Sequence, residues 1–547
     1  MAIEGFTEYA KEDLERYNAK RWWLGLTWSD LFDKATDIYP DKIGLVDGTG
    51  RWTFRELRDK VDRLAISLMG LGIKPKDWVL LQFPNWHEYI IAYFAMQKIG
   101  ALTVLLIPRH TRTEINHFAA LTMPVAWILP EQYGKIDYRP IINDVVKENP
   151  QLKHIIQVRT ENGCYPTLDE LIANAEFTPE NLKTLEERRP DPDEVSHIMP
   201  TGGSTGLPKA SVRTHNSYIT NVEYHSKVWD ITSNDTLMVV TPVGHSMAMH
   251  WGIGAALLNY AKLVLLDATT PEDICSTIEK EKVTALPSVP ALVARILAME
   301  NLEDYDLTSL KKISLGGAPS TPEMLKTAYD KLKCLVINAF GSSEGTNIST
   351  RPGDSMEVIL NSVGRPACPY DTIKIIDDAG NEVPPLTEGE LVSKGPGIFT
   401  GYFKSAGENK DIFTADGFFK TGDKARKDQF GNITITGRIK DIINRGGEKI
   451  SAIDIENRMS EHPAVREIAV VGMPDPVLGE RICAYVVLKP GMILTFEEIV
   501  AFLKKGGASV QQLPERVEFL ADLPVTKVGK VDKKALREDI KEKITSS

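Results

Sequence analysis

The sequence predicts an α/β protein: a large, multi-lobed N-terminal domain with layered sheets and helices, followed by a small α+β domain. Three observations support this prediction. The chain has 547 residues, too many for one hydrophobic core. Its composition, with 42% apolar and 25% charged residues, is that of an ordinary globular protein. Short aliphatic runs alternate with helical patterns over roughly the first 430 residues, as in layered α/β folds.

Individual elements of the N-terminal region follow from local patterns. The segment 88–100 carries apolar residues at helical spacing. Residues 315–318, Leu-Gly-Gly-Ala, are expected to end a strand in a tight turn. The next segment, Ser-Thr-Pro-Glu at 320–323, combines a hydroxyl cap, a proline and an acid, which predicts a helix start. Continuous apolar runs predict buried strands of largely parallel sheets at 78–83, 126–129, 236–240 and 262–266.

The pattern changes after Arg438, within a polar stretch that suits a linker. We therefore predict two domains, 1–437 and 438–547, the second being large enough for a small α+β unit. Its expected helices and strands are, in order, a helix at 451–461, strands at 467–472 and 483–489, and helices near 496–504 and 533–543.

Charge and cysteine usage exclude several classes of function. A net charge of −11 argues against nucleic acid as the main partner, so any phosphate site must be a local pocket. No basic start followed by an apolar run and no apolar stretch of about 18 residues is present, which predicts a cytoplasmic protein without membrane insertion. The scattered cysteines, without a CxxC pair, read as reduced thiols and support neither zinc nor disulfides: Cys164, Cys275, Cys334, Cys368 and Cys483.

A glycine- and hydroxyl-rich segment, Thr201-Gly-Gly-Ser-Thr-Gly-Leu-Pro-Lys209, suits a loop that holds a polyphosphate. Glycine lets backbone N–H groups approach anionic oxygens, while hydroxyls and a lysine add donors and charge. It is not a Walker loop, because Leu207 and Pro208 separate the last glycine from the lysine. Alone, the segment could equally be a flexible surface turn. The candidate phosphate-binding residues are Thr201, Gly203, Ser204, Thr205, Gly206 and Lys209.

Four further motifs follow in order: Asn338-Ala-Phe-Gly-Ser-Ser-Glu344, Phe419-Lys-Thr-Gly-Asp423, a stretch from Gly437 to Lys449 and Val528-Gly-Lys530. With the loop, they resemble the adenylate-forming superfamily of acyl-CoA synthetases, peptide-synthetase adenylation domains and luciferases. The resemblance covers nearly the whole chain. Gly-Gly-Ser-Thr-Gly, Ile-Asn-Arg-Gly-Gly-Glu-Lys and the C-terminal Lys-Val-Gly-Lys-Val-Asp are most similar to the 2,3-dihydroxybenzoate-AMP ligase branch. The resemblance implies that ATP activates a carboxylate as acyl-AMP, which a thiol then attacks.

The resemblance also implies roles for particular residues. Lys530 would bridge the acyl carboxylate and the α-phosphate, Lys209 would grip the β- and γ-phosphates, and Glu344 would hold Mg²⁺ through oxygen. Taken singly, an acid such as Glu344 is more often a solvated loop residue. Likewise, a lysine-rich tail such as the one after Lys530 is more often a solvated helix face. The expected nucleotide site consists of Gly316, Gly317, Ala318, Asn338, Ala339 and Phe340 around adenine, Gly341, Ser342 and Ser343 near the α-phosphate, and Asp423 and Arg438 at the ribose.

Thiol attack requires space where Lys530 lies. Members of the superfamily rotate the small, mobile domain about a hinge, whose position corresponds here to Lys440. Gly446 and Gly447 would then line a tunnel for the pantetheine arm of coenzyme A, because a side chain would block it. The alternative is that both glycines only form a hairpin turn.

The expected acyl pocket lies around residues 242–251. Aryl-acid ligases of the resembling branch carry a His-Asn pair here, whereas this chain has His245 followed by Ser246. An apolar pocket without a partner for ring hydroxyls suits benzoate or a cyclohexane- or cyclohexene-carboxylate, and a short aliphatic acid remains open. Met247, Met249 and Trp251 could equally be a buried core stripe. The candidate pocket residues are His245, Ser246, Trp251, Gly317 and Gly341.

The function expected from the sequence is that of an AMP-forming acyl-CoA ligase using ATP, Mg²⁺ and coenzyme A. No carrier domain follows Lys530 before the sequence ends at Ser547, so the thiol must come from another molecule, and free coenzyme A is the simpler choice. One alternative is an aryl-acid adenylase that loads a separate carrier protein. Another is a nucleotide-binding regulator without turnover, against which an intact Lys530 argues. Both half-reactions are reversible, so the enzyme could also make ATP from the thioester.

Overall fold

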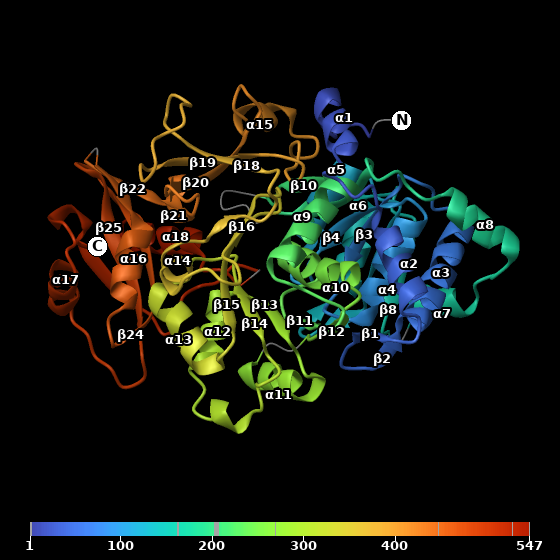
Figure 1. Cartoon of the computed structure of the whole chain (residues 1–547), viewed down its shortest axis with the longest axis horizontal. Coiled ribbons are helices and arrows are strands. Elements are labelled where there is room, and N and C mark those ends of the chain that lie inside the picture. The colour runs from blue at the N-terminus through green and yellow to red at the C-terminus, as the bar shows by residue number, and fades with distance from the viewer. Residues whose placement is uncertain are drawn as a thin grey trace.

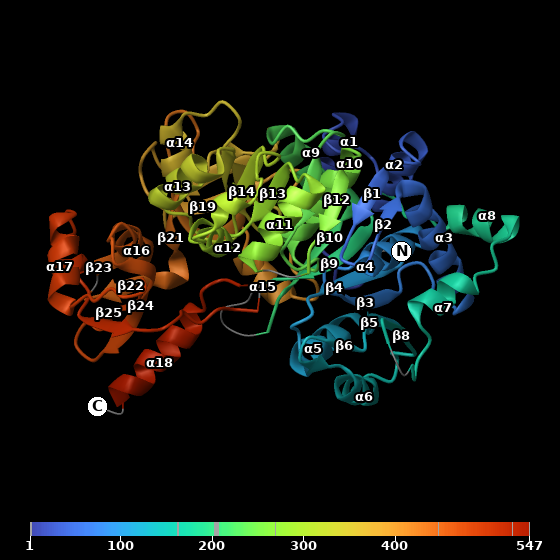
Figure 2. The same ribbon diagram turned by 90° about the horizontal axis from the view of Figure 1, so that it is seen from below.

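The computed structural model describes residues 3–160, 163–201, 207–267, 270–446, 448–527 and 529–545. The N-terminal two thirds form a broad body, and the C-terminal segment forms a separate lobe at the left of Figure 1. Figure 2 shows this lobe from below, with the last helix projecting from it. Within the described residues, no helix is both long and apolar enough to cross a membrane.

A nine-stranded sheet forms one layer of the body. Its central strands are parallel, and antiparallel strands flank them at both edges. The burial of the central strands on both faces explains their continuous aliphatic sequences. The order is β17-β16-β15-β14-β13-β11-β12-β1-β2. The strands are β1 Ile43–Val46, β2 Arg51–Thr53, β11 Thr236–Val239, β12 Lys262–Leu265, β13 Ala285–Ser288, β14 Lys312–Leu315, β15 Leu335–Gly341, β16 Asn347–Ser349 and β17 Arg365–Pro366.

A six-stranded sheet forms a second layer and is parallel except for its edge strand β10. The loop between β9 and β10 contains the predicted phosphate-binding segment. The order is β10-β9-β4-β3-β5-β8. The strands are β3 Trp78–Gln82, β4 Leu102–Leu106, β5 Ala126–Pro130, β8 His154–Val158, β9 Val195–Pro200 and β10 Ala210–Thr214; β6 Gln132–Tyr133 and β7 Ile136–Asp137 form a small hairpin beside it.

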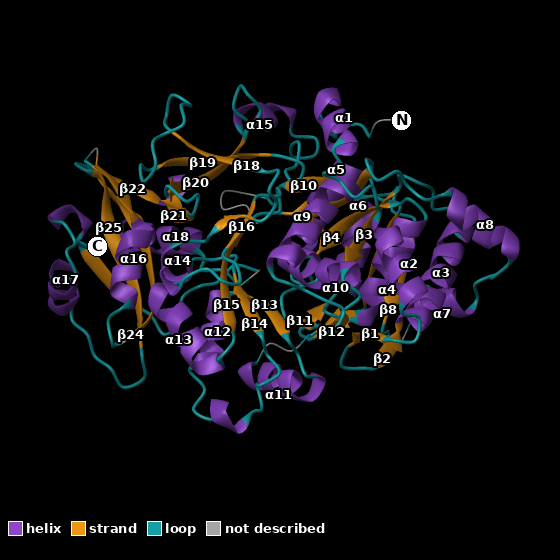
Figure 3. Cartoon of the chain, viewed as in Figure 1, coloured by secondary structure: helices purple, strands orange, loops and turns teal. Residues whose placement is uncertain are grey.

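Helices lie between and outside the two sheets, as the purple ribbons of Figure 3 show. The largest hydrophobic cluster joins both sheets through inner helices, and two further clusters lie under the outer helices. The inner helices are α2 Trp28–Ile38, α3 Phe54–Gly70, α4 His87–Lys98, α9 His215–Val228 and α10 Ala255–Leu258. The outer ones are α5 Arg112–Thr122, α6 Arg139–Glu148, α11 Pro271–Glu281, α12 Pro290–Leu297 and α13 Pro322–Leu332.

Two smaller sheets complete the chain. An antiparallel sheet of order β18-β19-β20-β21 precedes the C-terminal lobe, whose five-stranded sheet has clusters on both faces. The strands are β18 Thr372–Ile376, β19 Gly389–Lys394, β20 Phe419–Lys427, β21 Ile433–Arg438, β22 Ile442–Arg445, β23 Glu448–Ser451, β24 Val465–Asp475, β25 Gly479–Leu488 and β26 Arg516–Phe519. The remaining helices include α1 Lys11–Ala19, α7 Leu168–Ala173, α8 Pro179–Glu187, α14 Met356–Asn361, α15 Ala406–Asp411, α16 Ala452–Ser460, α17 Phe496–Lys505 and α18 Lys533–Thr545.

The predicted fold class is confirmed, and so are the elements expected from local patterns. Helix α13 begins after Thr321, whose hydroxyl accepts from the N–H of Met324, with a proline in the first turn. Strands β24 and β25 are longer than expected because they pair as one extended hairpin. The sequence reading did not foresee the sheet β18–β21, and Asp423 lies on one of its strands. The domain boundary at 437/438 stays a prediction.

Candidate active site

Lys530 brings the C-terminal lobe to the centre of the predicted site. A Cβ at Gly317, in the turn after β14, would lie 3.7 Å from Lys530 Cε. Burial and the charge of Arg438 lower the pKa of Lys530 to about 8, and the carboxylates of Glu344 and Asp423 oppose this shift. The carboxylates of Glu344 and Asp423, from distant segments, thus lie near enough to Lys530 for their charges to act on it.

Helix α5 holds both the phosphate loop and the turn before Lys530. His117 Nε2 lies 3.0 Å from the carbonyl oxygen of Pro208, at the end of the loop. Glu114, in the first turn of the same helix, pairs with Lys527. The backbone N–H of Thr201 donates to the Lys209 carbonyl at 2.9 Å, which closes the base of the loop. Residues Gly203, Ser204, Thr205 and Gly206 lie outside the described residues.

Asp423 and Arg438 face each other across β20 and β21. They are register partners, and Arg438 Nε donates to Asp423 Oδ1 at 2.9 Å. Burial raises the pKa of Asp423, and the guanidinium opposes the shift. The sequence assigns both residues to the ribose; in the structure they pair with each other, with the Arg438 side chain 46% exposed. The pair presents a carboxylate and a guanidinium beside Lys530.

Glu344 lies in the turn after β15 and is fixed by an aromatic hydroxyl. Tyr402 donates from its hydroxyl to Glu344 Oε1 at 2.6 Å, and burial and Glu344 raise the pKa of that phenol. Lys209 lies 4.8 Å from the centre of the Tyr402 ring and forms an ion pair with Glu408. The sequence reading missed Tyr402 and Glu408. The only trace of this contact in the sequence is the aromatic residue directly after Gly401, in the stretch between two of the motifs.

The predicted adenine slot is built from the ends of β14 and β15. Asn338 donates from Nδ2 to the carbonyl of Ser362 at 2.8 Å, so its side chain anchors the segment after α14. Phe340 packs against the apolar face of the sheet β18–β21. Ser342 Oγ is buried and, among the described residues, has no hydrogen-bond partner. An orphaned hydroxyl beside Glu344 fits a site that holds a phosphate-bearing ligand. Gly316, Gly317 and Ala318 form the bend after β14, Ala339 and Gly341 lie on β15, and Ser343 precedes Glu344.

Trp251, a residue of the predicted acyl pocket, lies against two glycines, Gly316 and Gly341. It lies on a π-helical segment, Ala248–Gly254, and its indole stacks on His225 with centroids 4.6 Å apart. A Cβ at Gly316 would lie 2.6 Å from Trp251 Cη2, so only glycine fits there. A Cβ at Gly341 would lie 3.4 Å from the same ring.

The outer part of the pocket contains His245, Ser246 and Met247. His245 Nδ1 accepts from the N–H of Met247 at 3.2 Å, so the proton of the neutral ring is on Nε2. Burial and the charge of Lys530 lower the pKa of His245 to about 3, which keeps the ring neutral. Tyr218 donates from its hydroxyl to the Ser246 carbonyl at 3.3 Å. Apolar walls and a neutral imidazole suit an uncharged ring.

The predicted hinge residue lies near this centre, because the charge of Lys440 acts on both Lys530 and Asp423. Lys440 is in a short 3₁₀ turn, Ile439–Asp441, directly between the last strand of one sheet and the first of the next. Burial and Arg438 lower its pKa. Gly446 turns the hairpin between β22 and β23 with φ of +58°, and a Cβ there would lie 3.2 Å from Leu478. Gly447 and Val528 lie outside the described residues.

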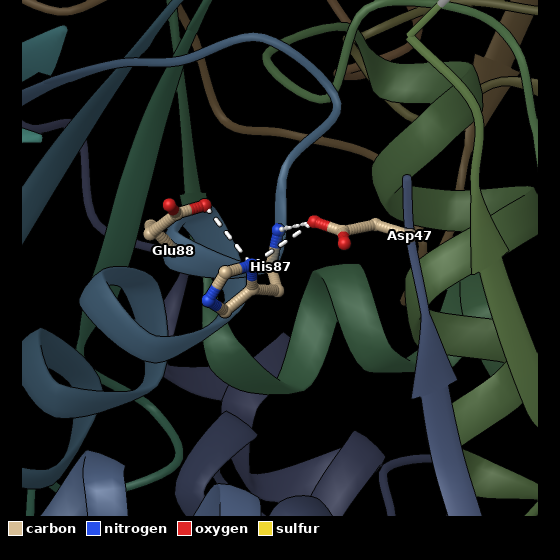
Figure 4. Close-up of side chains that lie close together, drawn as sticks. All are labelled: Asp47, His87 and Glu88. Carbon is tan, nitrogen blue, oxygen red and sulfur yellow. Dashed lines mark hydrogen bonds and ion pairs between the residues drawn. The ribbon is translucent and has the colours of Figure 1, made fainter. Parts of the chain in front are cut away.

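A second charged cluster lies elsewhere, around His87 at the start of α4 (Figure 4). His87 Nδ1 lies 3.0 Å from Asp47 Oδ2 and 3.2 Å from Glu88 Oε2. Arg159 forms two hydrogen bonds to Glu88, of 2.7 and 2.9 Å, and its guanidinium packs on Trp86 at 3.8 Å. The Arg159 guanidinium pairs with both carboxylates, so the cluster is an ion-pair network linking the two large sheets.

Comparisons with known proteins identify the family of the chain. Family models described as AMP-binding enzyme and AMP-binding enzyme C-terminal domain match residues 32–403 and 454–530. A 2,3-dihydroxybenzoate-AMP ligase of Bacillus subtilis is 36% identical over 543 residues, covering 99% of each chain. A salicyl-AMP ligase / salicyl-S-ArCP synthetase of Mycobacterium tuberculosis is 34% identical over 98% of this chain and 94% of the relative.

Solved structures lead to the same family. The apo structure of MbtA from Mycobacterium smegmatis is 33% identical and aligns with a TM-score of 0.75 over 98% of both chains. The anthranilate CoA ligase AuaEII aligns with a TM-score of 0.87 at 22% identity over 95% of this chain and 98% of that one, which supports the fold alone. The resemblance to adenylate-forming enzymes is thus confirmed, and the chain belongs to the AMP-binding enzyme family, among relatives that are mostly aryl-acid AMP ligases.

Proposed function

We propose that this enzyme activates an aryl carboxylate with ATP as an acyl adenylate and passes the acyl group to the thiol of a separate carrier protein. The observation that carries the proposal is the position of Lys530. Its ammonium group lies beside the Gly317 turn and close to Glu344, Asp423 and Arg438. A fixed cation between an apolar pocket and a polar turn is what the joining of a carboxylate to a phosphate requires.

In the first half-reaction, a carboxylate oxygen attacks the α-phosphorus of ATP. The bond from that phosphorus to the bridging oxygen breaks, and pyrophosphate leaves with the electron pair. Lys530 stabilises the charge that gathers between the two anions, and the Asp423–Arg438 pair orients the ribose. Glu344 would hold Mg²⁺, which when bound neutralises charge on the phosphates.

In the second half-reaction, the thiol sulfur attacks the acyl carbon. The bond from that carbon to the AMP oxygen breaks, AMP leaves, and the thiol proton passes to solvent. Lys530 lies where the thiol must enter, so the lobe has to turn about Lys440 before transfer. The glycine turn at Gly446 would then approach the site.

A benzene carboxylate is the acid class that we propose. The relatives named above act, by their names, on 2,3-dihydroxybenzoate and salicylate. A carrier protein as acceptor agrees with the second of these names. A benzoate- or cyclohexene-carboxylate–CoA ligase is the second candidate. It is favoured by Ser246, which stands where the resembling ligases carry an amide, and by the Trp251 ring against the glycines Gly316 and Gly341.

The test is ATP–pyrophosphate exchange with a panel of acids, followed by acyl transfer from the preferred acid. Benzoate, salicylate, 2,3-dihydroxybenzoate and cyclohexene-carboxylate form the panel. Coenzyme A and a phosphopantetheinylated aryl carrier protein are compared as acceptors. Preferential loading of the carrier supports the proposal, and preferential formation of acyl-CoA supports the second candidate. Exchange with none of the acids would contradict both and favour a nucleotide-binding regulator.

A further inference from the structure

The turn that carries Glu344 is held from beneath by buried side chains of β10 and α9. The carbonyl of Ser343 accepts from Arg213 Nη1 at 3.0 Å, and the carbonyl of Gly345 accepts from Asn221 Nδ2 at 3.0 Å. Both donors are almost completely buried, with 1% and 2% exposure. The Ser343 carbonyl also accepts from the buried Ser211 hydroxyl at 3.1 Å. The backbone on either side of Glu344 is therefore fixed by several buried side chains, among which Arg213 and Asn221 each hold one side.

Arg213 connects this turn to two other segments. Its Nη2 donates to Asn221 Oδ1 and to the carbonyl of Gly397, both at 2.7 Å, and to the Ser217 carbonyl at 3.0 Å. Its Nε donates to Ser217 Oγ at 3.3 Å. The guanidinium thus reaches α9, the Ser343 turn and the Gly397 loop at once, which only its planar set of donors can do.

The charge of Arg213 has two acidic neighbours. Burial lowers the pKa of Arg213, and Asp371 and Glu344 oppose the shift. Asp371 accepts from the N–H of Gly397 at 3.2 Å and is itself buried, which raises its pKa to about 7. Among the described residues, the hydrogen bonds of Arg213 go to backbone carbonyls, to Asn221 Oδ1 and to Ser217 Oγ. A buried guanidinium bound mainly to backbone carbonyls serves geometry more than charge pairing.

We propose that Arg213 is a positioning residue that, with Asn221, sets the place of the Glu344 carboxylate and thereby the affinity for Mg²⁺·ATP. The carboxylate is held at its far end by Tyr402 and at its backbone by Arg213 and Asn221. The inference rests on the proposed function, in which Glu344 holds the metal ion. It adds a residue outside every motif that the sequence reading used.

Arg213→Lys separates geometry from charge. Lysine keeps the positive charge, but one nitrogen cannot reach the Ser343 carbonyl, Asn221 and Gly397 together. We expect the half-saturating Mg²⁺ concentration in ATP–pyrophosphate exchange to rise about 10- to 100-fold, the range typical of lost partners of metal ligands. Calorimetric titration with Mg²⁺·ATP, without acid, should show the same loss of affinity. Acyl transfer from supplied acyl adenylate, which needs no nucleotide triphosphate, should keep its wild-type rate.

Two control variants in α9 separate positioning from destabilisation. Ser217→Ala removes a partner of Arg213 that does not touch the turn, and Val222→Ala removes core volume without touching the network. Neither should change the Mg²⁺ requirement. Asn221→Ser is the second test variant, because it frees the Gly345 carbonyl while leaving the guanidinium in place.

The calorimetric cycle with Glu344→Gln decides whether Arg213 acts through Glu344. If it does, Arg213→Lys adds little further loss of Mg²⁺·ATP affinity in the Glu344→Gln background. The inference would be overturned if the losses of Mg²⁺·ATP affinity in Arg213→Lys and Glu344→Gln were fully additive. It would also be overturned if both Arg213→Lys and Asn221→Ser left the Mg²⁺ requirement unchanged. Failure of the wild type to exchange pyrophosphate with any acid would instead contradict the proposed function. The calorimetric cycle would still test whether Arg213 affects the affinity for Mg²⁺·ATP through Glu344.

Discussion

Lys527 of the C-terminal lobe forms an ion pair with Glu114 at the first turn of α5, across residues 413 positions apart in the chain. Burial opposes the ionisation of Glu114, but hydrogen bonds from Lys527 and from Thr111 outweigh it and lower the pKa of the carboxyl to about 2. Lys527 lies three residues before Lys530 in the chain. The ion pair therefore favours the arrangement in which Lys530 occupies the site.

Glu114→Gln should weaken that arrangement while keeping an acceptor for the helix cap. An ion pair of this exposure contributes about 0.2–1 kcal/mol, so kcat/KM for adenylation should fall about 1.4- to fivefold. Acyl transfer from supplied adenylate should not fall. In the wild type the contribution is present above the ordinary glutamate pKa and is lost as pH drops toward about 2. Lys534→Ala, which removes a surface pair within α18, is the control. An equal loss in both half-reactions would contradict the prediction.

The pKa of Lys530, lowered to about 8, predicts where the pH–rate profile of adenylation declines on its alkaline side. The residue acts as a cation, which is the form populated below that pH, so kcat/KM for ATP should fall as pH rises through about 8. Bound triphosphate favours the cation, so the alkaline decline in kcat should lie at higher pH. Lys530→Arg should shift the alkaline decline to higher pH.

Lys530→Ala should lower the rate of adenylation about 10²- to 10³-fold, as for a lost oxyanion donor, and leave the rate of acyl transfer unchanged. Equal loss of both steps would mean that Lys530 is structural.

Lys440→Pro tests the predicted hinge. Proline fixes φ at this position between two sheets, so the lobe should be unable to turn. Adenylation should survive, and thioester formation should fail. Stopped-flow measurement of each half-reaction checks this, with Lys449→Ala, on the neighbouring hairpin, as a control for a charge change alone. Wild-type thioester turnover in the proline variant would exclude rotation about this residue.

Selectivity should depend on Ser246. A ring hydroxyl without a partner in an apolar pocket costs roughly 1–3 kcal/mol, about ten- to a hundredfold in selectivity. Benzoate or cyclohexene-carboxylate should therefore be activated with a higher kcat/KM than salicylate or 2,3-dihydroxybenzoate. Ser246→Asn should narrow the difference by supplying an amide, whereas Ser246→Ala should not. Wild-type preference for 2,3-dihydroxybenzoate would contradict this reading of the pocket, although it would agree with the proposed carrier-loading activity.

The ion-pair network at Asp47 predicts that the folded protein loses stability at acidic pH. Burial opposes ionisation of Asp47, but hydrogen bonds from His87 and Thr49 outweigh it and hold the carboxyl pKa well below its usual range. Its stabilisation is present above the unfolded pKa of about 3.9 and is lost as pH falls further. Asp47→Asn should lower the thermal midpoint at pH 7 and flatten its decline below pH 4. Asp137→Asn, at an exposed carboxylate, should change little. A parallel acid decline in Asp47→Asn and wild type would contradict the assignment.

Local patterns were sufficient for the central strands and for several helices, because burial and capping leave a direct trace in sequence, but not for the sheet β18–β21. Thr321 and Pro322 mark the start of α13, and the apolar runs mark the central strands. The motifs also placed Lys530, Glu344 and Asp423 in one site. Contacts between distant segments leave no such trace.

The parts that sequence could not predict depend on long-range packing. Tyr402 reaches Glu344 from 58 positions away. Trp251 lies on a π-helical segment, whose i→i+5 hydrogen bonds sequence patterns do not distinguish from those of an ordinary helix. Arg213 is a charge inside a buried strand, which marks it as unusual but does not name its partners. The pairing of Asp423 with Arg438 required the register of an antiparallel sheet that the sequence reading missed.

The hairpin at Gly446 has a consequence for the timing of the reaction. In this structure its turn rests beside Leu478, and Lys449 on its second strand pairs with Asp378 at 3.6 Å, away from Lys530. On the proposed function, the acceptor thiol then has no entrance while ATP and acid are being joined. Initial-rate plots against ATP and acceptor should give parallel lines, because pyrophosphate departs before the acceptor binds. The acceptor, the third substrate, would thus bind only after pyrophosphate, the first product, has left.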